Sequence, residues 1–390
     1  MNIFLLGNGF DLHHDLPTHY IDFLDTVDFM LHEILCDSYS TVGKVFGNPK
    51  LNKINETIKK CNEKYKRVYE SIMVDSESAG QLVDLANNND WFRYILERYR
   101  KNATWIDFEQ EISCVCHVFE KYFEANRKYK KLTVKKEYVA IFRYFNSIFT
   151  IEHGYSQYSG SYESINIKKQ FIKQDEHNHS ILNELLIIET LSNSLKELAT
   201  MLSLYLKLFV DNTIDGLVAN NLIKRNGIFD DVNHVFTLNY TNTFAKVYGD
   251  NNDNTLHIHG NIDSEIVLGV QADKNDELQE NDTTFIPFKK YYQRSIYETE
   301  YLLNKKIYDL KQSKDIIKLS VMGHSLDITD RDIIKKLFDI ADRIVIYYYG
   351  DKKAHGNCVK KLIHIFGQEK YDEIVTRTLL QYLPLLTDFL

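Results

Sequence analysis

The first residues constrain the fold of this chain more than any other segment. In residues 2–6, NIFLL, every position after Asn2 is apolar, which is typical of a strand buried on both faces in a parallel sheet. The run stops at Gly7-Asn8-Gly9, and we expect this loop to extend to about Pro17. Apolar residues then recur every three to four positions over 20–34, which predicts an amphipathic helix with Thr18 as its N-cap.

Further strands are expected only from residue 234 onward. They are predicted at 234–238, 256–259, 266–270, 316–323 and 343–350, with helices at 288–311 and 330–340. Alternating strands and helices favour a parallel sheet with right-handed crossovers. The sequence therefore predicts an α/β fold, in which a discontinuous Rossmann-like domain of residues 1–36 and 230–390 is split by a large insertion.

The insertion, residues 37–229, is predicted to be an all-helical domain. Its clearest helix carries apolar residues in alternating steps of four and three, the pattern of a packed helical seam: Leu191, Leu195, Leu198, Leu202, Tyr205 and Phe209. We expect a helix of a bundle, and a seam between copies of the chain is the alternative. Residues 86–90 and 152–164 are predicted to be exposed loops.

Composition narrows the classes of partner. The chain has 47 Lys and Arg against 55 Asp and Glu, a net charge of −8, so no global cationic field favours nucleic-acid binding. Its five cysteines are scattered without a CxxC pair, which suits free thiols in a reducing compartment. No signal peptide and no apolar run of about 20 residues is present. We expect a cytoplasmic protein with no membrane segment.

The glycine turn has two interpretations. Glycines after a parallel strand let backbone N–H groups approach a pyrophosphate, but the dinucleotide fingerprint places a third glycine where this chain has Leu12. A tight structural turn is the alternative. A second polar stretch, Asn239 and Tyr240, follows the predicted strand 234–238, at the edge where open α/β sheets bind ligands. There, Asn239 either orients a water or ribose hydroxyl or satisfies its own turn.

Two further stretches carry candidate groups. In LHIHGNID, a strand would place His257 and His259 on one face, with His259 as a general base or the pair as metal ligands. A third ligand at a suitable spacing is not evident, so we predict no metal. In VMGHSLDITD, Gly323 and Ser325 are candidate ribose or phosphate contacts, and Thr329 or Asp330 is expected to cap the next helix.

The segment TWIDFEQEI (104–112) also carries two acidic residues. Asp107 and Glu111 stand one helical turn apart, but Thr104 and Asp107 match a capping box as well. The role of Trp105, Asp107 and Glu111 therefore stays open.

Taken together in their order, these stretches resemble the AbiH family of bacterial abortive-infection proteins. GNGFDLHHDLPTHYIDF, FTLNYTNTF, LHIHGNI and MGHSLDITD carry the resemblance. They are also similar, more distantly, to the sirtuin-like fold, whose corresponding segments surround NAD. This similarity implies that Asn239 and His259 are catalytic, and that Gly7, Gly9, Gly323 and Ser325 contact the dinucleotide. Asn8, Tyr240 and the missing zinc-binding cysteine quartet depart from the deacetylase pattern and count against lysine deacetylation.

The resemblance implies an antiphage protein that binds NAD and hydrolyses its N-glycosidic bond, releasing nicotinamide. Asn239 would hold the ribose or the water and His259 would act as base. The Gly7 to Gly9 turn would bind the pyrophosphate, with Asp11 near the nicotinamide ribose and Asn8 and Tyr240 in the binding set. NAD is then substrate or ligand, and no further cofactor is required. A non-catalytic nucleotide sensor and a nucleic-acid-processing toxin are the alternatives. We also expect a phage-derived trigger and an oligomer formed through the insertion.

Overall fold

The structure is a computed structural model. It describes residues 1–33, 41–46, 51, 63–102, 106–156, 160–223, 225, 227–249, 254–271 and 283–385. The chain forms two compact units, the first comprising Met1–Leu82, Leu202–Val267 and Arg294–Leu390, and the second Val83–Met201 and Leu268–Gln293. The predicted domain boundaries at residues 36/37 and 229/230 stay a prediction.

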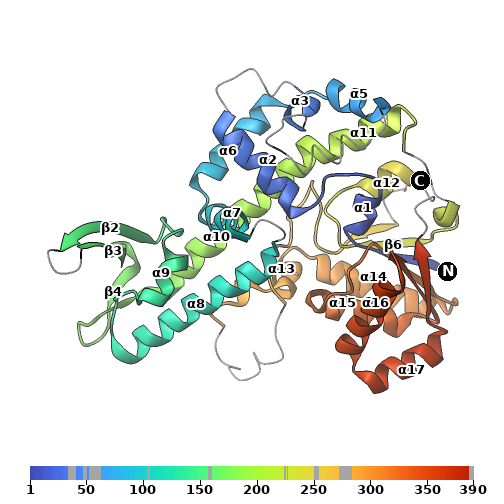
Figure 1. Cartoon of the computed structure of the whole chain (residues 1–390). Coiled ribbons are helices and arrows are strands. Elements are labelled where there is room, and N and C mark those ends of the chain that lie inside the picture. The colour runs from blue at the N-terminus through green and yellow to red at the C-terminus, as the bar shows by residue number, and fades with distance from the viewer. Residues whose placement is uncertain are drawn as a thin grey trace. The chain divides into compact units, whose positions relative to one another are not determined.

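In the described part of the first unit, six parallel strands form one sheet (Figure 1). The strands are β1 (Asn2–Leu6), β6 (His234–Thr237), β7 (Thr255–His257), β8 (Lys318–Met322), β9 (Arg343–Tyr349) and β10 (Gln381–Leu385). Their order across the sheet is β10-β9-β8-β1-β6-β7. Numbered in chain order within this sheet and read from the β7 edge, the order is 3-2-1-4-5-6, which is that of doubly wound dinucleotide-binding folds. The predicted α/β class with a parallel sheet is confirmed.

Strand β1 lies in the middle of the sheet. It pairs with β6 on one side and β8 on the other, so that Leu6 stands opposite both Thr237 and Met322. Alternate residues of a strand point to opposite faces: Ile3 and Leu5 belong to one hydrophobic cluster, and Phe4 and Leu6 to another. Residues 3–6 of the strand are apolar and buried because both faces of the sheet are covered, as predicted.

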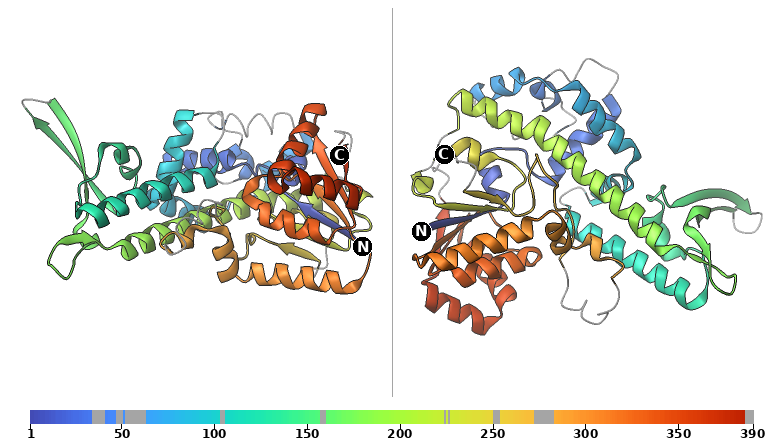
Figure 2. Two further views of the ribbon diagram at one scale, coloured as in Figure 1. Left: turned by 90° about the horizontal axis from the view of Figure 1, so that it is seen from below. Right: turned by 180° about the vertical axis from the view of Figure 1, so that it is seen from behind.

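Helices cover both faces of the sheet. The cluster around Ile3 and Leu5 receives side chains from α14 (Thr299–Ser313), α15 (Arg331–Ile340), α16 (Lys352–Phe366) and α17 (Gln368–Thr378). Figure 2 shows these four helices, in orange and red, gathered beside the sheet. The cluster on the other face contains Phe10 of α1 (Gly9–His13) and Phe244 of α12 (Thr243–Tyr248). The two short helices α1 and α12 position the site described below.

The remaining helices lie mostly in the predicted insertion. They are α2 (Tyr20–Glu33), α3 (Val42–Phe46), α5 (Glu63–Ser71), α6 (Ser76–Asn88), α7 (Asp90–Asn102), α8 (Phe108–Tyr129), α9 (Lys136–Phe142), α10 (Glu184–Tyr205), α11 (Asn212–Ala219) and α13 (Lys290–Ile296). A π-helical segment, Leu206–Asp211, joins α10 to α11. The six residues of the predicted seam are all buried. The seam therefore packs within the chain, as expected of a bundle helix, and it offers no exposed surface to a second copy.

The insertion is not all helical, so that part of the prediction is wrong. Of the segment 152–164, expected to be a loop, residues 152–156 and 160–164 belong to an antiparallel hairpin of β2 (Phe149–Ser156) and β3 (Gly160–Ile167) (Figure 1), and residues 157–159 lie outside the described part. A second hairpin pairs β4 (Ile172–Gln174) with β5 (Ser180–Leu182). The Tyr, Thr and Ile residues of the first hairpin favour strands, and this preference outweighs the Gly and Ser residues that suggested a loop.

Four other local predictions are also wrong. Segment 266–270 forms no strand and makes only an isolated bridge at Val270. The helix predicted at 288–311 is divided into α13 and α14, and the loop predicted at 86–90 is reduced to Asn89 between α6 and α7. Thr18 does not cap α2. Instead the Asp22 carboxylate accepts a hydrogen bond from the His19 backbone N–H (3.0 Å), so the cap comes from inside the first turn.

Candidate functional site

The Gly7-Asn8-Gly9 turn packs directly against the end of β8. The Gly7 N–H donates to the Met322 carbonyl (3.1 Å) and the Gly9 N–H donates to the Gly323 carbonyl (2.8 Å). A Cβ on Gly9 would stand 2.8 Å from the Gly323 Cα, and a Cβ on Gly323 would stand 2.2 Å from the Phe10 nitrogen. The glycines therefore permit two backbones to touch. Both amides predicted to face a pyrophosphate donate hydrogen bonds within the chain.

The loop does not extend to Pro17, because α1 begins at Gly9. Asn8 stands at the N-cap position without capping, and its side-chain amide donates to the Thr18 carbonyl (3.1 Å). The short turn matters for the site because it places Asp11 in the first turn of α1, where its side chain is buried.

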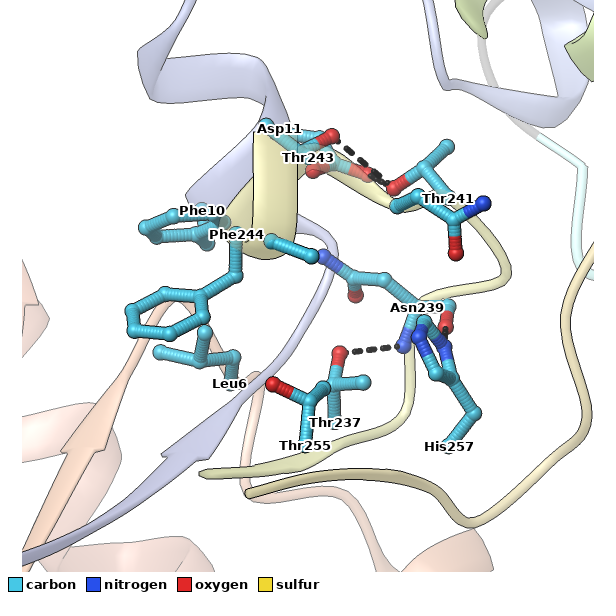
Figure 3. A pocket seen from close by; sticks show the side chains of 12 residues that line it. Leu6, Phe10, Asp11, Thr237, Asn239, Thr241, Thr243, Phe244, Thr255 and His257 are labelled. Carbon is cyan, nitrogen blue, oxygen red and sulfur yellow. Dashed lines mark hydrogen bonds between the residues drawn. The ribbon is translucent and has the colours of Figure 1, made fainter. Parts of the chain in front are cut away.

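A small pocket lies at the carboxyl ends of β1, β6 and β7 (Figure 3). It is lined by Leu6, Phe10, Asp11, Thr237, Asn239, Thr241, Asn242, Thr243, Phe244, Ala245, Thr255 and His257. The structure thus brings the predicted Asp11 and Asn239 to the same pocket. Thr241 hydrogen-bonds Asp11 across 230 positions of sequence, which joins the two distant segments directly.

Asp11 is the buried carboxylate of this pocket, with 1% of its surface exposed. Its Oδ2 accepts a hydrogen bond from the Thr241 hydroxyl (2.6 Å), which in turn accepts one from the Thr243 hydroxyl (3.0 Å). Its Oδ1 makes no hydrogen bond with the described residues. Burial raises the pKa of Asp11 to about 6, although the polar groups of Thr241, Thr243 and Asn239 oppose the shift. Asp11 therefore changes charge near pH 6.

Asn239 is held through its backbone on both sides. Its N–H donates to the Thr237 hydroxyl (3.1 Å), and its carbonyl lies 3.0 Å from Nδ1 of His257. Because a carbonyl only accepts, His257 carries a proton on Nδ1. These two contacts fix the main chain while the Asn239 side chain faces the pocket (Figure 3). Sequence reasoning did not assign His257 this contact.

His259 does not line this pocket. Strand β7 ends at His257, so His259 lies in the following turn, and the prediction that both imidazoles share a strand face is wrong. Gly260 has a φ of +74°, and a Cβ there would stand 1.9 Å from the Glu265 carbonyl oxygen, which makes this turn dependent on glycine. The His259 ring is 5% exposed, and its Nε2 lies 3.5 Å from Asp330 Oδ1.

Asp330 also faces a second imidazole. Its Oδ2 lies 3.5 Å from Nε2 of His324, whose side chain is 3% exposed. Asp330 occupies the N-cap position of α15, but its side chain makes no capping hydrogen bond. The prediction that it caps the helix is therefore wrong. Sequence reasoning missed this His-Asp-His cluster, for which His324 and Asp330 within one polar stretch were the available signal.

The remaining predicted contacts lie outside the pocket. The Tyr240 hydroxyl donates to the Val267 carbonyl (3.1 Å). Ser325 is exposed, and its carbonyl accepts from Lys361 Nζ (2.9 Å). Gly323 belongs to the glycine contact described above. Gly323 and Ser325 thus lie in the turn after β8, and the Tyr240 hydroxyl contacts the loop after β7.

The two acidic residues of the 104–112 segment have structural partners. Asp107 is itself the N-cap of α8 and accepts hydrogen bonds from the Glu109 and Gln110 amides. The buried Glu111 accepts from the Tyr94 hydroxyl (2.6 Å) and lies 3.2 Å from Nε of Arg98. Thr104 and Trp105 lie outside the described residues.

A search of the described residues finds no group of three His, Cys, Asp or Glu side chains suited to hold a metal ion. None of the described helices is long and apolar enough to cross a membrane. Of the five cysteines, Cys36 and Cys61 lie outside the described part, and the other three are free thiols.

Comparison with known families gives one result. The model of the family described as bacteriophage abortive infection AbiH matches residues 3–349, which is most of the chain and includes both the pocket and the His-Asp-His cluster. No curated protein and no solved structure matches the chain.

Proposed function

We propose that this chain, which belongs to the AbiH family of bacteriophage abortive-infection proteins, acts in phage defence by hydrolysing the N-glycosidic bond of NAD. The family membership carries the defence role. The observation that supports the chemistry is the meeting of Asp11 and Asn239 in one pocket at the carboxyl ends of parallel strands. This is the edge at which open α/β sheets bind their ligands.

Hydrolysis of NAD mainly requires stabilisation of positive charge on the ribose and a water molecule positioned to attack it. Nicotinamide leaves from a cationic ring nitrogen, so the transition state has oxocarbenium character at the ribose. We infer that Asn239 orients the water and that Asp11, ionised at neutral pH, accepts its proton. The water oxygen then bonds to C1′, the C1′–N bond breaks, and its electron pair neutralises the pyridine ring. A pKa of about 6 suits a general base at neutral pH.

We further propose that His259 acts on a ribose hydroxyl of the substrate. Asn8, Tyr240, Gly323 and Ser325 would border the rest of the dinucleotide. The Gly7 and Gly9 amides already donate to β8, so these two residues would contribute shape to the site, and other donors would have to bind the phosphates.

The test is nicotinamide release from NAD by purified protein, alone and with lysate of phage-infected cells. Asp11→Asn and Asn239→Ala should each lower the rate by about 10²–10⁴-fold, the range for loss of a general base or of an equally critical positioning group. Asp339→Asn, an exposed acid on α15, is the matched control and should leave the rate unchanged.

Two outcomes would favour the alternatives. Thermal stabilisation by ADP-ribose without nicotinamide release, in all of these conditions, would indicate a nucleotide sensor. Loss of cellular RNA or DNA on expression, with NAD unchanged, would indicate a nucleic-acid-processing toxin.

A further inference from the structure

The His259, Asp330 and His324 cluster is the second group of buried ionisable side chains at this edge of the sheet. Both oxygens of Asp330 are engaged, one 3.5 Å from His259 Nε2 and the other 3.5 Å from His324 Nε2. The side chains are 5%, 12% and 3% exposed in the order His259, Asp330, His324. A carboxylate in such surroundings favours imidazole N–H groups directed toward it.

The orientation of Asp330 is not explained by the helix that it begins. An aspartate at an N-cap normally accepts from the backbone amides of the first turn, but this side chain does not. His324 is oriented from its other side, because its Nδ1 accepts a hydrogen bond from the Leu326 N–H (2.8 Å). Its ring proton therefore lies on Nε2, facing Asp330. The carboxylate is held by His324 and turned toward His259.

The sheet order shows what this contact spans. His259 follows β7 and Asp330 follows β8, and β6 and β1 lie between those two strands. Neighbouring strands are about 4.8 Å apart, so β7 and β8 are separated by roughly 14 Å. The segments that follow β7 and β8 nevertheless meet, because His259 and Asp330 lie 3.5 Å apart. This contact therefore crosses the carboxyl ends of the strands that lead into Gly7 and Asn239.

We propose that Asp330 is a positioning residue for His259, with His324 as the group that holds the carboxylate in place. The inference rests on the proposed NAD hydrolysis for the role of His259. In the neutral ring, a proton on Nε2 would face Asp330 Oδ1 at 3.5 Å, and Nδ1 would be the nitrogen that accepts. When Nδ1 takes a proton from the ribose hydroxyl, Asp330 stabilises the imidazolium, as the buried aspartate does in a catalytic triad.

The decisive variant is Asp330→Asn, which keeps the size of the side chain and removes its charge. Loss of a carboxylate within 4 Å lowers the pKa of an imidazole by about 1–3 units, so the acid limb of the kcat/KM profile for NAD should move to lower pH until the ionisation of Asp11 limits it. We expect kcat to fall by roughly 10–100-fold with a smaller change in KM. His324 faces Asp330, so His324→Gln acts on His259 only through that carboxylate. It should move the acid limb in the same direction by a smaller amount. Asp339→Asn should leave the profile unchanged.

A second measurement does not depend on turnover. The His259 ring can be titrated by NMR in the full chain, with its signal assigned by loss in His259→Gln. In Asp330→Asn the midpoint should move to lower pH by about 1–3 pH units. An unchanged midpoint in a folded variant, or an unchanged rate profile, would overturn the positioning role. A shifted midpoint in a protein that releases no nicotinamide would support the pair and refute the NAD reaction.

Discussion

Replacement of Gly323 by alanine should destabilise the first unit more than most single substitutions. The residue has a φ of +68°, and a Cβ there would meet the Phe10 nitrogen at 2.2 Å and the Gly9 carbonyl carbon at 2.6 Å. Both neighbours are backbone atoms, so no flexible side chain can yield. The turn after β1 and the end of β8 would have to separate.

The size of the effect follows from two contributions. A left-handed conformation costs an alanine roughly 1–2 kcal/mol. Forcing an extra methyl group into a packed contact costs roughly 1–3 kcal/mol more. The free energy of unfolding should therefore fall by about 2–5 kcal/mol, and part of that loss would arise from weakening the Gly9 N–H to Gly323 carbonyl bond of 2.8 Å.

The assay is urea unfolding followed by circular dichroism. Gly356→Ala is the matched control, since Gly356 lies within α16 and a Cβ there would meet nothing within 4 Å. That change should stabilise the protein by about 0.5–1 kcal/mol, because alanine favours a helix interior. If Gly323→Ala unfolds within 0.5 kcal/mol of wild type, the close backbone contact described here is wrong.

Three further predictions concern other parts of the chain. Because the pKa of Asp11 is raised from 3.8 to about 6, the folded state binds its proton more tightly than the unfolded state, and stability should fall as pH rises from about 4 to 6. Asp11→Asn should therefore be more stable than wild type by up to about 3 kcal/mol at pH 7 and equal to it below pH 4, measured by urea unfolding; equal stability at both pH values would contradict the burial argument. On α10, Leu198→Ala should cost about 2–5 kcal/mol and Leu185→Ala almost nothing, because the two leucines are 0% and 78% exposed; similar thermal shifts for both would refute the internal seam. Glu111→Gln should lower the free energy of unfolding by about 1–3 kcal/mol, because it weakens the contacts with Tyr94 and Arg98. An unchanged unfolding midpoint would show that those contacts contribute little.

The central strands were predictable from sequence, whereas the edge strand β10 was not. Strands β1, β8 and β9 are mostly apolar, because burial on both faces favours that composition. Strand β10 was missed because it is a partly exposed edge strand that contains Pro384, and proline argues against a central strand.

Segment 266–270 shows the opposite error. It is apolar and buried, yet its backbone groups bond elsewhere. The Val267 N–H donates to the His259 carbonyl, and the Leu268 N–H and carbonyl both bond the Gln293 side chain. The apolar composition of this segment correctly indicated that it is buried. Which groups accept and donate the hydrogen bonds of its backbone is decided by tertiary contacts, which the composition does not show.

Those residues of the candidate site that follow a recognisable strand could be predicted from the sequence. Asn239 follows a recognisable strand, and Asp11 follows the glycine turn, so their approach could be inferred from the parallel topology. The contact between His259 and Asp330 joins two loops, and loop geometry leaves no periodic signal in a sequence. The raised pKa of Asp11 likewise depends on the burial of its carboxylate, which composition does not reveal.

The central place of β1 has a consequence for biosynthesis. Asn2 hydrogen-bonds Asn233, which follows it by 231 positions, and its other neighbour, β8, begins only at Lys318. At translation rates of about 5–20 residues/s, roughly 10–50 s pass between the synthesis of β1 and that of β6, its first partner strand. During that interval the nascent chain exposes an apolar segment that has no partner strand and that chaperones can bind. The pocket itself cannot assemble until its last lining residue, His257, about two thirds of the way along the chain, has emerged.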